Sequence, residues 1–413
     1  MAELKAHNGA GPWWDPLNIS APTNWANIRA PAVMWAGWYD IFLQGNLHGH
    51  YIYQHLSDPM VRGRNYLVVD PLGHCQDGAK YFPDQVGLIE GRTILPALLS
   101  LQMVAGNGTI SDPAEGVKAV TFYVMGPDPS NPSVGPSPRG NHWSTLDSWP
   151  VWSGQRLYLG RAGTATLAAQ GAPSPVAPAA NASYVYDPKD PVKTVGGNNL
   201  IEACGPSDQR PVESRPDVLL HTSAALEADL YLTGPLRATL FVSSSAVDTD
   251  FTAKLSDVYP DGTSRLIQDG VLRMRWRLGG DTFWPVAPTP VVPGQIYRVE
   301  VDCWNTSYVF NKGHRLRVAV SSSNSPRFKA NPNLGIDISE EDAHEPIIAT
   351  NTLFYGGEHA SYFELPVVQK AQLPKMILLI DPERKGSGHG PMVRPELIHA
   401  ARNLTQFVAS RAT

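Results

Sequence analysis

The chain has 413 residues, a length typical of two or three domains. It carries 33 lysines and arginines against 38 aspartates and glutamates, and this net charge of −5 argues against a nucleic-acid-binding protein. Glycine (36) and proline (37) are abundant while 42% of the residues are hydrophobic, so the composition predicts many turns between short strands, not disorder.

The sequence shows no pattern that directs a protein into a membrane. No apolar run approaches the roughly 18 residues that a membrane-spanning helix needs, and the first residues lack the apolar stretch of a signal peptide. We therefore expect a soluble protein without membrane contact, and the sequence leaves its cellular compartment open.

Three cysteines, Cys75, Cys204 and Cys303, lie far apart in the chain. Their spacing fits no metal site, and their odd number indicates no disulfide framework. We expect neither a metal ion nor another cofactor.

Residues 1–138 are predicted to form an α/β unit. Short apolar runs typical of buried parallel strands lie at 32–37, 66–70 and 120–126. After the first run, apolar residues recur every four positions from Leu43, which predicts a helix that stops before Pro59. A second helix is expected over about 86–105.

Residues 139–368 are predicted to form an all-β sandwich with a loop-rich entry. In one run, Leu272, Met274 and Trp276 alternate with arginines at 273, 275 and 277, as expected for a strand with one apolar face. Several such runs separated by Gly and Pro turns indicate a jelly roll, and we interpret the arginines as a solvated face. Residues 369–413 form an extra tail, predicted as a strand and a helix.

Asp40 and His74 each follow a predicted buried strand. Because the carboxyl ends of parallel strands meet at one edge of a sheet, the two side chains are candidates for a catalytic acid and base. In such a pair the carboxylate orients the imidazole, which takes a proton from a serine and returns it to the leaving group. The pattern alone favours ordinary roles, because an Asp after a strand is usually a helix cap or turn residue and a lone His is usually structural.

The context of both residues carries a family resemblance. The segment Ala36-Gly37-Trp38-Tyr39-Asp40-Ile41-Phe42 resembles the acid loop of the cocaine-esterase-like (CocE/NonD) serine hydrolases, relatives of the Xaa-Pro dipeptidyl-peptidases and α-amino-acid ester hydrolases. The segment Asp70-Pro71-Leu72-Gly73-His74 resembles their Gly-Pro-Trp-x-His loop, with Asp70 in place of Gly and Leu72 in place of Trp. Later segments resemble the family's C-terminal domain, among them Leu232-Thr233-Gly234-Pro235, Asp248-Thr249-Asp250-Phe251 and Asp269-Gly270-Val271.

This resemblance covers residues 25 to 368. It implies the C-terminal part of an α/β-hydrolase domain followed by a jelly-roll (galactose-binding-like) β-sandwich. It also implies hydrolysis of ester or amide bonds, in acyl or Xaa-Pro dipeptidyl substrates, through an acyl-enzyme. Asp40 and His74 are then the acid and the base, and Trp38 and Tyr39 are expected at the rim of the substrate pocket.

The nucleophile of the family has no counterpart in this sequence. Ser20 is the one serine before Asp40, and the Gly-x-Ser-x-Gly pattern of a nucleophile elbow does not occur. Two hypotheses follow. In the first, a serine hydrolase acts on a small ester or peptide, and a second chain or another copy of this one supplies the missing part. In the second, the protein is a non-catalytic binding or scaffold protein that uses its sandwich.

Weaker candidates remain. His48 and His50 point to different sides of a helix, so a metal shared with His55 is not expected. Cys75 is a possible replacement nucleophile beside His74. Four aspartates are candidates for calcium, although a Pro-Asp-Gly turn explains the last of them: Asp248, Asp250, Asp257 and Asp261.

Overall fold

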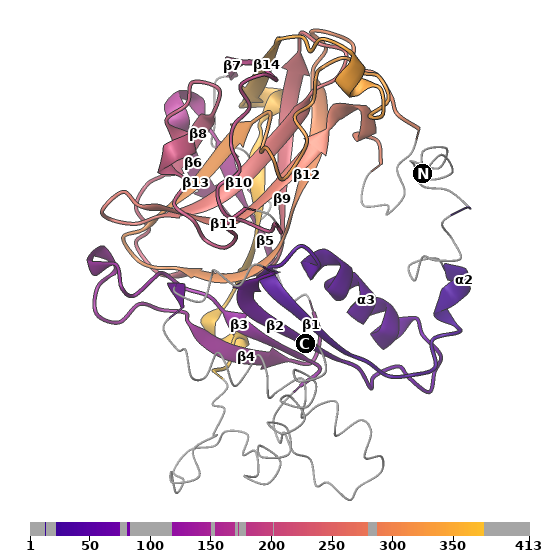
Figure 1. The fold of residues 1–413 in the computed structure, drawn as a ribbon. Coiled ribbons are helices and arrows are strands. Elements are labelled where there is room, and N and C mark those ends of the chain that lie inside the picture. The colour runs from indigo at the N-terminus through magenta and orange to yellow at the C-terminus, as the bar shows by residue number, and fades with distance from the viewer. Residues whose placement is uncertain are drawn as a thin grey trace, which may run out of the picture.

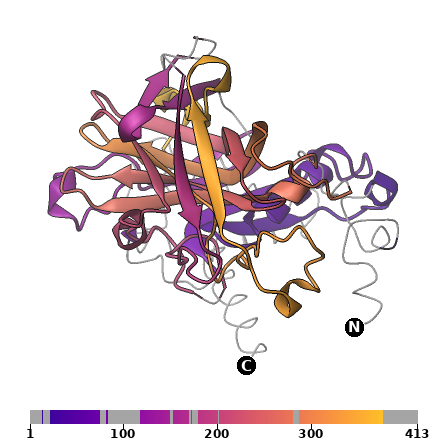
Figure 2. The same ribbon diagram turned by 90° about the horizontal axis from the view of Figure 1, so that it is seen from above.

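The computed structural model describes residues 13, 22–74, 81–82, 118–149, 153–169, 172, 179–200, 202–279 and 287–375. Its strands form two sheets, a small one near the N-terminus and a large one that folds over itself (Figure 1). Figure 2 shows the same arrangement from above. In the described part of the chain, no helix is long and apolar enough to cross a membrane.

The small sheet has the order β1-β2-β3-β4. Its strands are β1 (Val33–Tyr39), β2 (Tyr66–Gly73), β3 (Val120–Val124) and β4 (His142–Leu146). β1, β2 and β3 run parallel, while β4 is antiparallel to β3. The expected strands at 32–37, 66–70 and 120–126 are therefore confirmed, whereas the helix expected over 86–105 lies outside the described residues.

Helix α3 (Leu43–His55) connects β1 to β2 and covers one face of the small sheet (Figure 1). Such a crossover is needed because parallel neighbours cannot be joined by a tight turn. Leu43, Leu47 and Ile52 are buried on the inner side of the helix, and Gly49 lies against the side chain of Met34. The helix predicted from the spacing of apolar residues is confirmed.

The large sheet has eleven strands, in the order β11-β10-β13-β8-β6-β5-β15-β9-β14-β7, with β12 paired to β9. These strands are β5 (Ser153–Leu159), β6 (Thr164–Ala168), β7 (Ala180–Tyr186), β8 (Leu219–Ser223), β9 (Leu230–Ser244), β10 (Asp250–Val258), β11 (Ser264–Arg273), β12 (Tyr297–Phe310), β13 (Arg315–Ser321), β14 (Ala349–Tyr355) and β15 (Tyr362–Val368). β12 packs against β10 and β11 without a hydrogen-bonded ladder between them, which is the packing of a β-sandwich.

Short helical segments connect these strands. They are α2 (Pro22–Trp25), α5 (Arg210–Glu213), η3 (Pro132–Val134), η4 (Arg161–Gly163), η5 (Met274–Trp276), η6 (Glu341–Ala343), η7 (Gly357–His359) and η8 (Lys370–Gln372). The tail predicted from residue 369 therefore begins with a helical turn, and Lys375 bridges to Ser144 of β4. Residues 376–413 lie outside the described part. β4, expected in the loop-rich entry to the sandwich, pairs with the small sheet instead.

The arginines of the Leu272 run do not form a solvated face. The strand ends at Arg273, and residues 274–276 turn into η5, so the alternation is broken. The Arg273 guanidinium pairs with Asp250 at 3.0 Å, and that of Arg275 pairs with Asp248 at 2.8 Å. Arg273 and Arg275 both also reach Glu341, so these charges are neutralised inside the fold.

These ion pairs also account for two of the four aspartates considered for calcium. Asp257 is paired with the His314 ring at 2.9 Å and accepts a hydrogen bond from the Tyr308 hydroxyl at 2.7 Å. Asp261 accepts the backbone N–H of Thr263 in its turn. Among the described residues, no group of three or more His, Cys, Asp or Glu side chains is placed to hold a metal ion.

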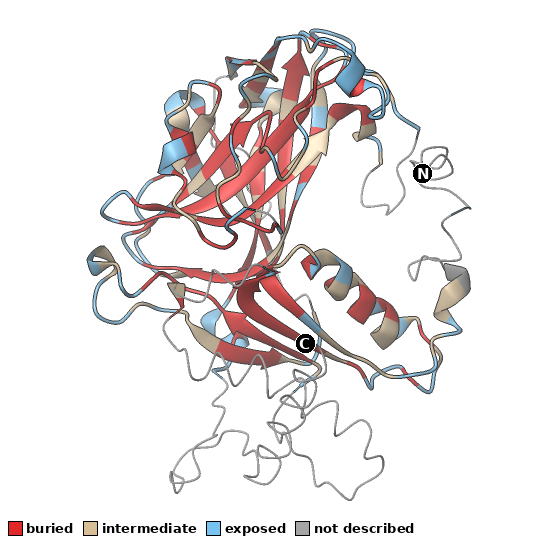
Figure 3. Cartoon of the chain, in the orientation of Figure 1, coloured by how far each residue is buried: buried red, intermediate tan, exposed pale blue. Residues whose placement is uncertain are grey.

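The two sheets meet in one continuous core. The Tyr39 hydroxyl at the end of β1 donates to the carbonyl of Leu266 in β11, and Met125, directly after β3, bridges to Tyr308 of β12. Figure 3 shows buried residues on both sides of this junction. The end of β1 is therefore held from both sheets.

Gly37 in β1 of the small sheet has no room for a side chain. A Cβ atom at Gly37 would lie 2.1 Å from the carbonyl oxygen of Leu72 in β2. Gly37→Ala is therefore expected to lower the free energy of unfolding by about 1–3 kcal/mol, because the strands must separate. Urea denaturation measures the change.

The matched control is Gly45→Ala, since an added Cβ at Gly45 on the exposed side of α3 meets no atom within 4 Å. This change is expected to leave stability unchanged or raise it by up to about 1 kcal/mol. Equal stability of both variants would contradict the close approach of β1 and β2.

Candidate active site

Asp40 and His74 lie side by side at the ends of β1 and β2. The two strands pair in parallel up to Tyr39 and Gly73, so the next residue of each strand emerges at the same edge. Asp40 Oδ2 lies 3.3 Å from His74 Nδ1, and Asp40 Oδ1 accepts the backbone N–H of Phe42 at 2.9 Å. One carboxylate oxygen is thus fixed by the turn, and the other faces the imidazole.

The pair opens into a hollow of about 390 Å³ lined by both residues. The His74 side chain is 49% exposed and that of Asp40 is 19% exposed. The Phe42 ring meets the imidazole edge-on, with centroids 5.5 Å apart, and Trp35 also lines the hollow. An accessible imidazole beside a mostly buried carboxylate can act as a general base.

Asp70, which stands where the resembling motif has glycine, has a structural role. Its carboxylate accepts the indole N–H of Trp35 at 2.9 Å and the backbone N–H of Leu72 at 2.8 Å. It therefore ties β1 to the turn that leads to His74. An aspartate in place of the motif's glycine is therefore compatible with this loop and with the contact between His74 and Asp40.

Trp38 and Tyr39, expected at the rim of a substrate pocket, are fully buried. The Trp38 indole N–H donates to the carbonyl of Tyr123, and its ring packs against Phe122 and Trp149. Burial raises the pKa of Tyr39 well above its ordinary value. Because β1 alternates its faces and both neighbours are covered, neither side chain reaches the hollow beside Asp40.

The turn after β1 is held by the sandwich. The Asn198 side-chain amide donates to the carbonyls of Trp38 (2.9 Å) and Asp40 (3.1 Å), and that of Gln268 donates to the Trp38 carbonyl at 2.6 Å. Gln44 of α3 bonds with Asn305 at 2.7 Å. These roles could not be predicted from sequence patterns, because Asn198 lies 158 residues from Asp40 in the chain.

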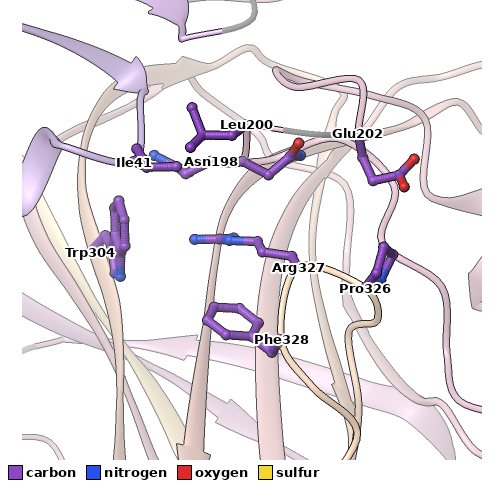
Figure 4. Close-up of a pocket in the computed structure, with 9 residues that line it drawn as sticks. Ile41, Asn198, Leu200, Glu202, Trp304, Pro326, Arg327 and Phe328 are labelled. Atoms are coloured by element: carbon purple, nitrogen blue, oxygen red, sulfur yellow. The ribbon is translucent and has the colours of Figure 1, made fainter. Parts of the chain in front are cut away.

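A second pocket, of about 370 Å³, lies on the other side of this turn (Figure 4). Ile41 and Asn198 form one wall, and Trp304, Arg327 and Phe328 lie opposite. The Arg327 guanidinium lies over the Phe328 ring at 4.7 Å from its centroid and is paired with Asp269. The lining is thus mainly apolar and aromatic, its central cation is paired, and Glu202 adds a carboxylate.

The cysteines depart from expectation. Cys204 is disulfide-bonded, so the expectation of no disulfide was wrong for it, while Cys303 is a free, buried thiol. Folding places Cys204 against Gly73, where an added Cβ would lie 2.5 Å from its sulfur. Sequence spacing could not show this approach. Cys75, considered as a nucleophile, lies outside the described residues, as does Ser20.

Three comparisons place the chain in a family. Residues 118–364 match the X-Pro dipeptidyl-peptidase C-terminal non-catalytic domain. The chain belongs to the CocE/NonD family. It is 35% identical over 365 residues to cocaine esterase from Rhodococcus sp., covering 86% of this chain. It is 28% identical over 254 residues to a putative serine esterase of Mycobacterium tuberculosis, covering 55% of this chain and 36% of that protein.

Solved structures share the fold. An α-amino acid ester hydrolase and an aminopeptidase from a marine sediment archaeon (Thaumarchaeota) are each 22% identical, with TM-scores of 0.66 and 0.68. A CocE/NonD family hydrolase from Staphylococcus aureus is 14% identical, with a TM-score of 0.58. Each match covers 89% of this chain. The names of these relatives and solved structures are those of esterases, hydrolases and an aminopeptidase.

The chain spans only part of these relatives. It covers 59% of the Rhodococcus cocaine esterase, 60% of the ester hydrolase and of the aminopeptidase, and 59% of the Staphylococcus hydrolase. Asp40 and His74 lie outside the segment that matches the non-catalytic domain.

The histidines of α3 are a separate feature of this region. His50 is buried, and burial lowers its pKa from 6.5 to about 4. Since the unfolded chain binds the proton and the folded chain does not, His50 is expected to cost stability as the pH falls from 6.5 towards 4. His50→Leu should therefore lose less stability than the wild type between pH 7 and pH 5, as measured by urea midpoints.

His55→Leu serves as the control, because His55 lies on the exposed side of the same helix. The urea midpoint of His55→Leu should change between pH 7 and pH 5 by the same amount as that of the wild type. A difference between His50→Leu and wild type that stays constant from pH 7 to pH 5 would contradict a neutral, buried His50.

Proposed function

We propose that this chain supplies the acid and the base of a serine-type hydrolase that cleaves ester or amide bonds through an acyl-enzyme. The observation that carries the proposal is the 3.3 Å contact between Asp40 Oδ2 and His74 Nδ1 at the ends of two parallel strands. In this proposal the small sheet is the C-terminal part of an α/β-hydrolase domain, and the large sheet is a jelly roll. The hydrolase and esterase names of the relatives support it.

The chemistry assigned to the pair is a proton relay. His74 takes the proton from a serine hydroxyl as the serine oxygen bonds to the substrate carbonyl, and then gives that proton to the leaving group. Water then attacks the acyl-enzyme, again with His74 as the base, which releases the acid product and the serine. Asp40 remains ionised throughout, holds the Nδ1–H of His74 and stabilises the imidazolium.

The serine is proposed to come from a polypeptide segment outside residues 1–413 that packs beside β1. β1 is the terminal strand of the small sheet, and β2 is its one described neighbour. Trp35 on this strand is 44% exposed, although strands of parallel sheets are normally covered on both faces. A parallel strand that leads into a nucleophile elbow fits this edge and places its serine beside His74.

The proposal is tested on the protein purified through an affinity tag from cells that produce it, together with whatever binds to it. A fluorophosphonate probe is expected to label a serine in the purified material, and p-nitrophenyl esters are expected to be hydrolysed. Asp40→Asn and His74→Ala should each lower kcat by about 10³-fold or more, because the serine loses its base. Mass spectrometry identifies the labelled polypeptide.

His55→Ala is the matched control, since this exposed histidine of α3 lies outside the pair and should leave activity unchanged. Absence of any labelled polypeptide, or hydrolysis that survives His74→Ala, would refute the hydrolase proposal.

A second candidate is a non-catalytic binding protein that uses its sandwich. It is favoured by the match of residues 118–364 to a domain described as non-catalytic. On this reading, glycan-array or pull-down binding persists in His74→Ala and Asp40→Asn, and no ester is hydrolysed.

A further inference from the structure

The turn that carries Asp40 is clamped by a side chain of the sandwich. Both contacts of Asn198 come from its Nδ2, which donates to the carbonyl of Trp38 at 2.9 Å and to that of Asp40 at 3.1 Å. An amide nitrogen has two hydrogens, so the donor capacity of Asn198 is fully used on this one turn. We call this pair of hydrogen bonds the clamp. It holds the carbonyl of Asp40 and that of Trp38, two residues before it.

The oxygen of the same amide accepts no hydrogen bond from the described residues. Asn198 is fully buried, and its Oδ1 has no hydrogen-bond partner among the described residues. A buried carbonyl oxygen without a partner costs free energy, which offsets much of what the two donated bonds contribute to stability. The clear effect of Asn198 is therefore to fix the position of the turn.

The clamp acts on the residue whose orientation matters for His74. The Asp40 carbonyl also accepts the N–H of Leu43 at 3.2 Å, and Asp40 Oδ1 accepts that of Phe42 at 2.9 Å. The backbone of Asp40 is thus held from both sides, which leaves Oδ2 directed at His74 Nδ1. Rotation of the Asp40 peptide would carry Oδ2 away from the imidazole.

We propose that Asn198 is a positioning residue that sets the orientation of Asp40 towards His74, so that the sandwich takes part in arranging the catalytic pair. The effect of Asn198 on catalysis rests on the proposed function, whereas its effect on the position of Asp40 does not. The clamp itself is a property of the folded chain. Asn198 also forms a wall of the second pocket, so a group bound there would lie against the clamp (Figure 4).

The adjacent asparagine provides a matched comparison. Asn199 is also buried and also has an Oδ1 without a partner among the described residues. Its Nδ2 donates to the carbonyls of Gly196 (3.0 Å) and Ala203 (3.3 Å), within its own loop. Asn199→Leu removes the same chemical group from the same loop without touching the turn of Asp40.

Hydrogen–deuterium exchange with peptide-resolved mass spectrometry tests the clamp without any need for catalysis. Asn198→Leu is expected to raise the exchange of the amides at 40–43 about tenfold, because the two donated bonds are lost. Asn199→Leu is expected to raise exchange only within 196–203. Asn198→Asp, which keeps the size but has no N–H donors, is the second variant and should match Asn198→Leu.

A folded Asn198 variant with unchanged exchange at 40–43, or an equal rise in Asn199→Leu, would overturn the proposal. Esterase kinetics on the tagged complex provide the second readout. Asn198→Leu should lower kcat about tenfold or more with little change in KM, because the base is misdirected while binding persists. Raised exchange in material that shows no hydrolysis would refute the proposed function and leave the clamp supported.

Discussion

The parallel pairing of β1 with β2 sets the positions of both candidate catalytic side chains. Each strand delivers one residue to the same edge of the sheet, and the two backbones approach closely at Gly37, where the register shifts before Tyr39 pairs with Gly73. The remaining contacts refine this arrangement: Asp70 holds the turn before His74, and the backbone N–H of Phe42 holds one oxygen of Asp40. The sheet thus brings together two groups that are 34 residues apart in the chain.

The sandwich supports the same edge from the opposite side. Hydrogen bonds from Asn198 and Gln268 reach the backbone carbonyls of Trp38 and Asp40, and the Tyr39 hydroxyl extends into β11. Buried backbone carbonyls need hydrogen-bond partners, and the sandwich supplies some of those at the end of β1. The part of the chain that matches a non-catalytic domain therefore still shapes the geometry of the candidate active site.

Local features of the fold could be predicted from the sequence, because they depend on residues close together in the chain. The apolar runs gave β1 and β2, the four-residue spacing from Leu43 gave α3, and the turn residues gave Asp40 and His74. Contacts that depend on distant partners could not be predicted in this way. Arg273 was assigned to a solvated face because its partner Glu341 lies 68 residues further on. Trp38 and Tyr39 were placed at a rim because the sequence does not show what covers β1.

The hydroxyl of Tyr39 and its bond to Leu266 have a consequence for how the protein can be divided. An expression boundary placed between the sheets, after β4 and before β5, would leave the Tyr39 hydroxyl and the Trp38 carbonyl in one fragment and their partners in the other. Each fragment would then present unpaired polar groups on a freshly exposed apolar surface, which promotes aggregation. Every described strand lies within residues 33–368, so a fragment that keeps all of their pairings must span this range.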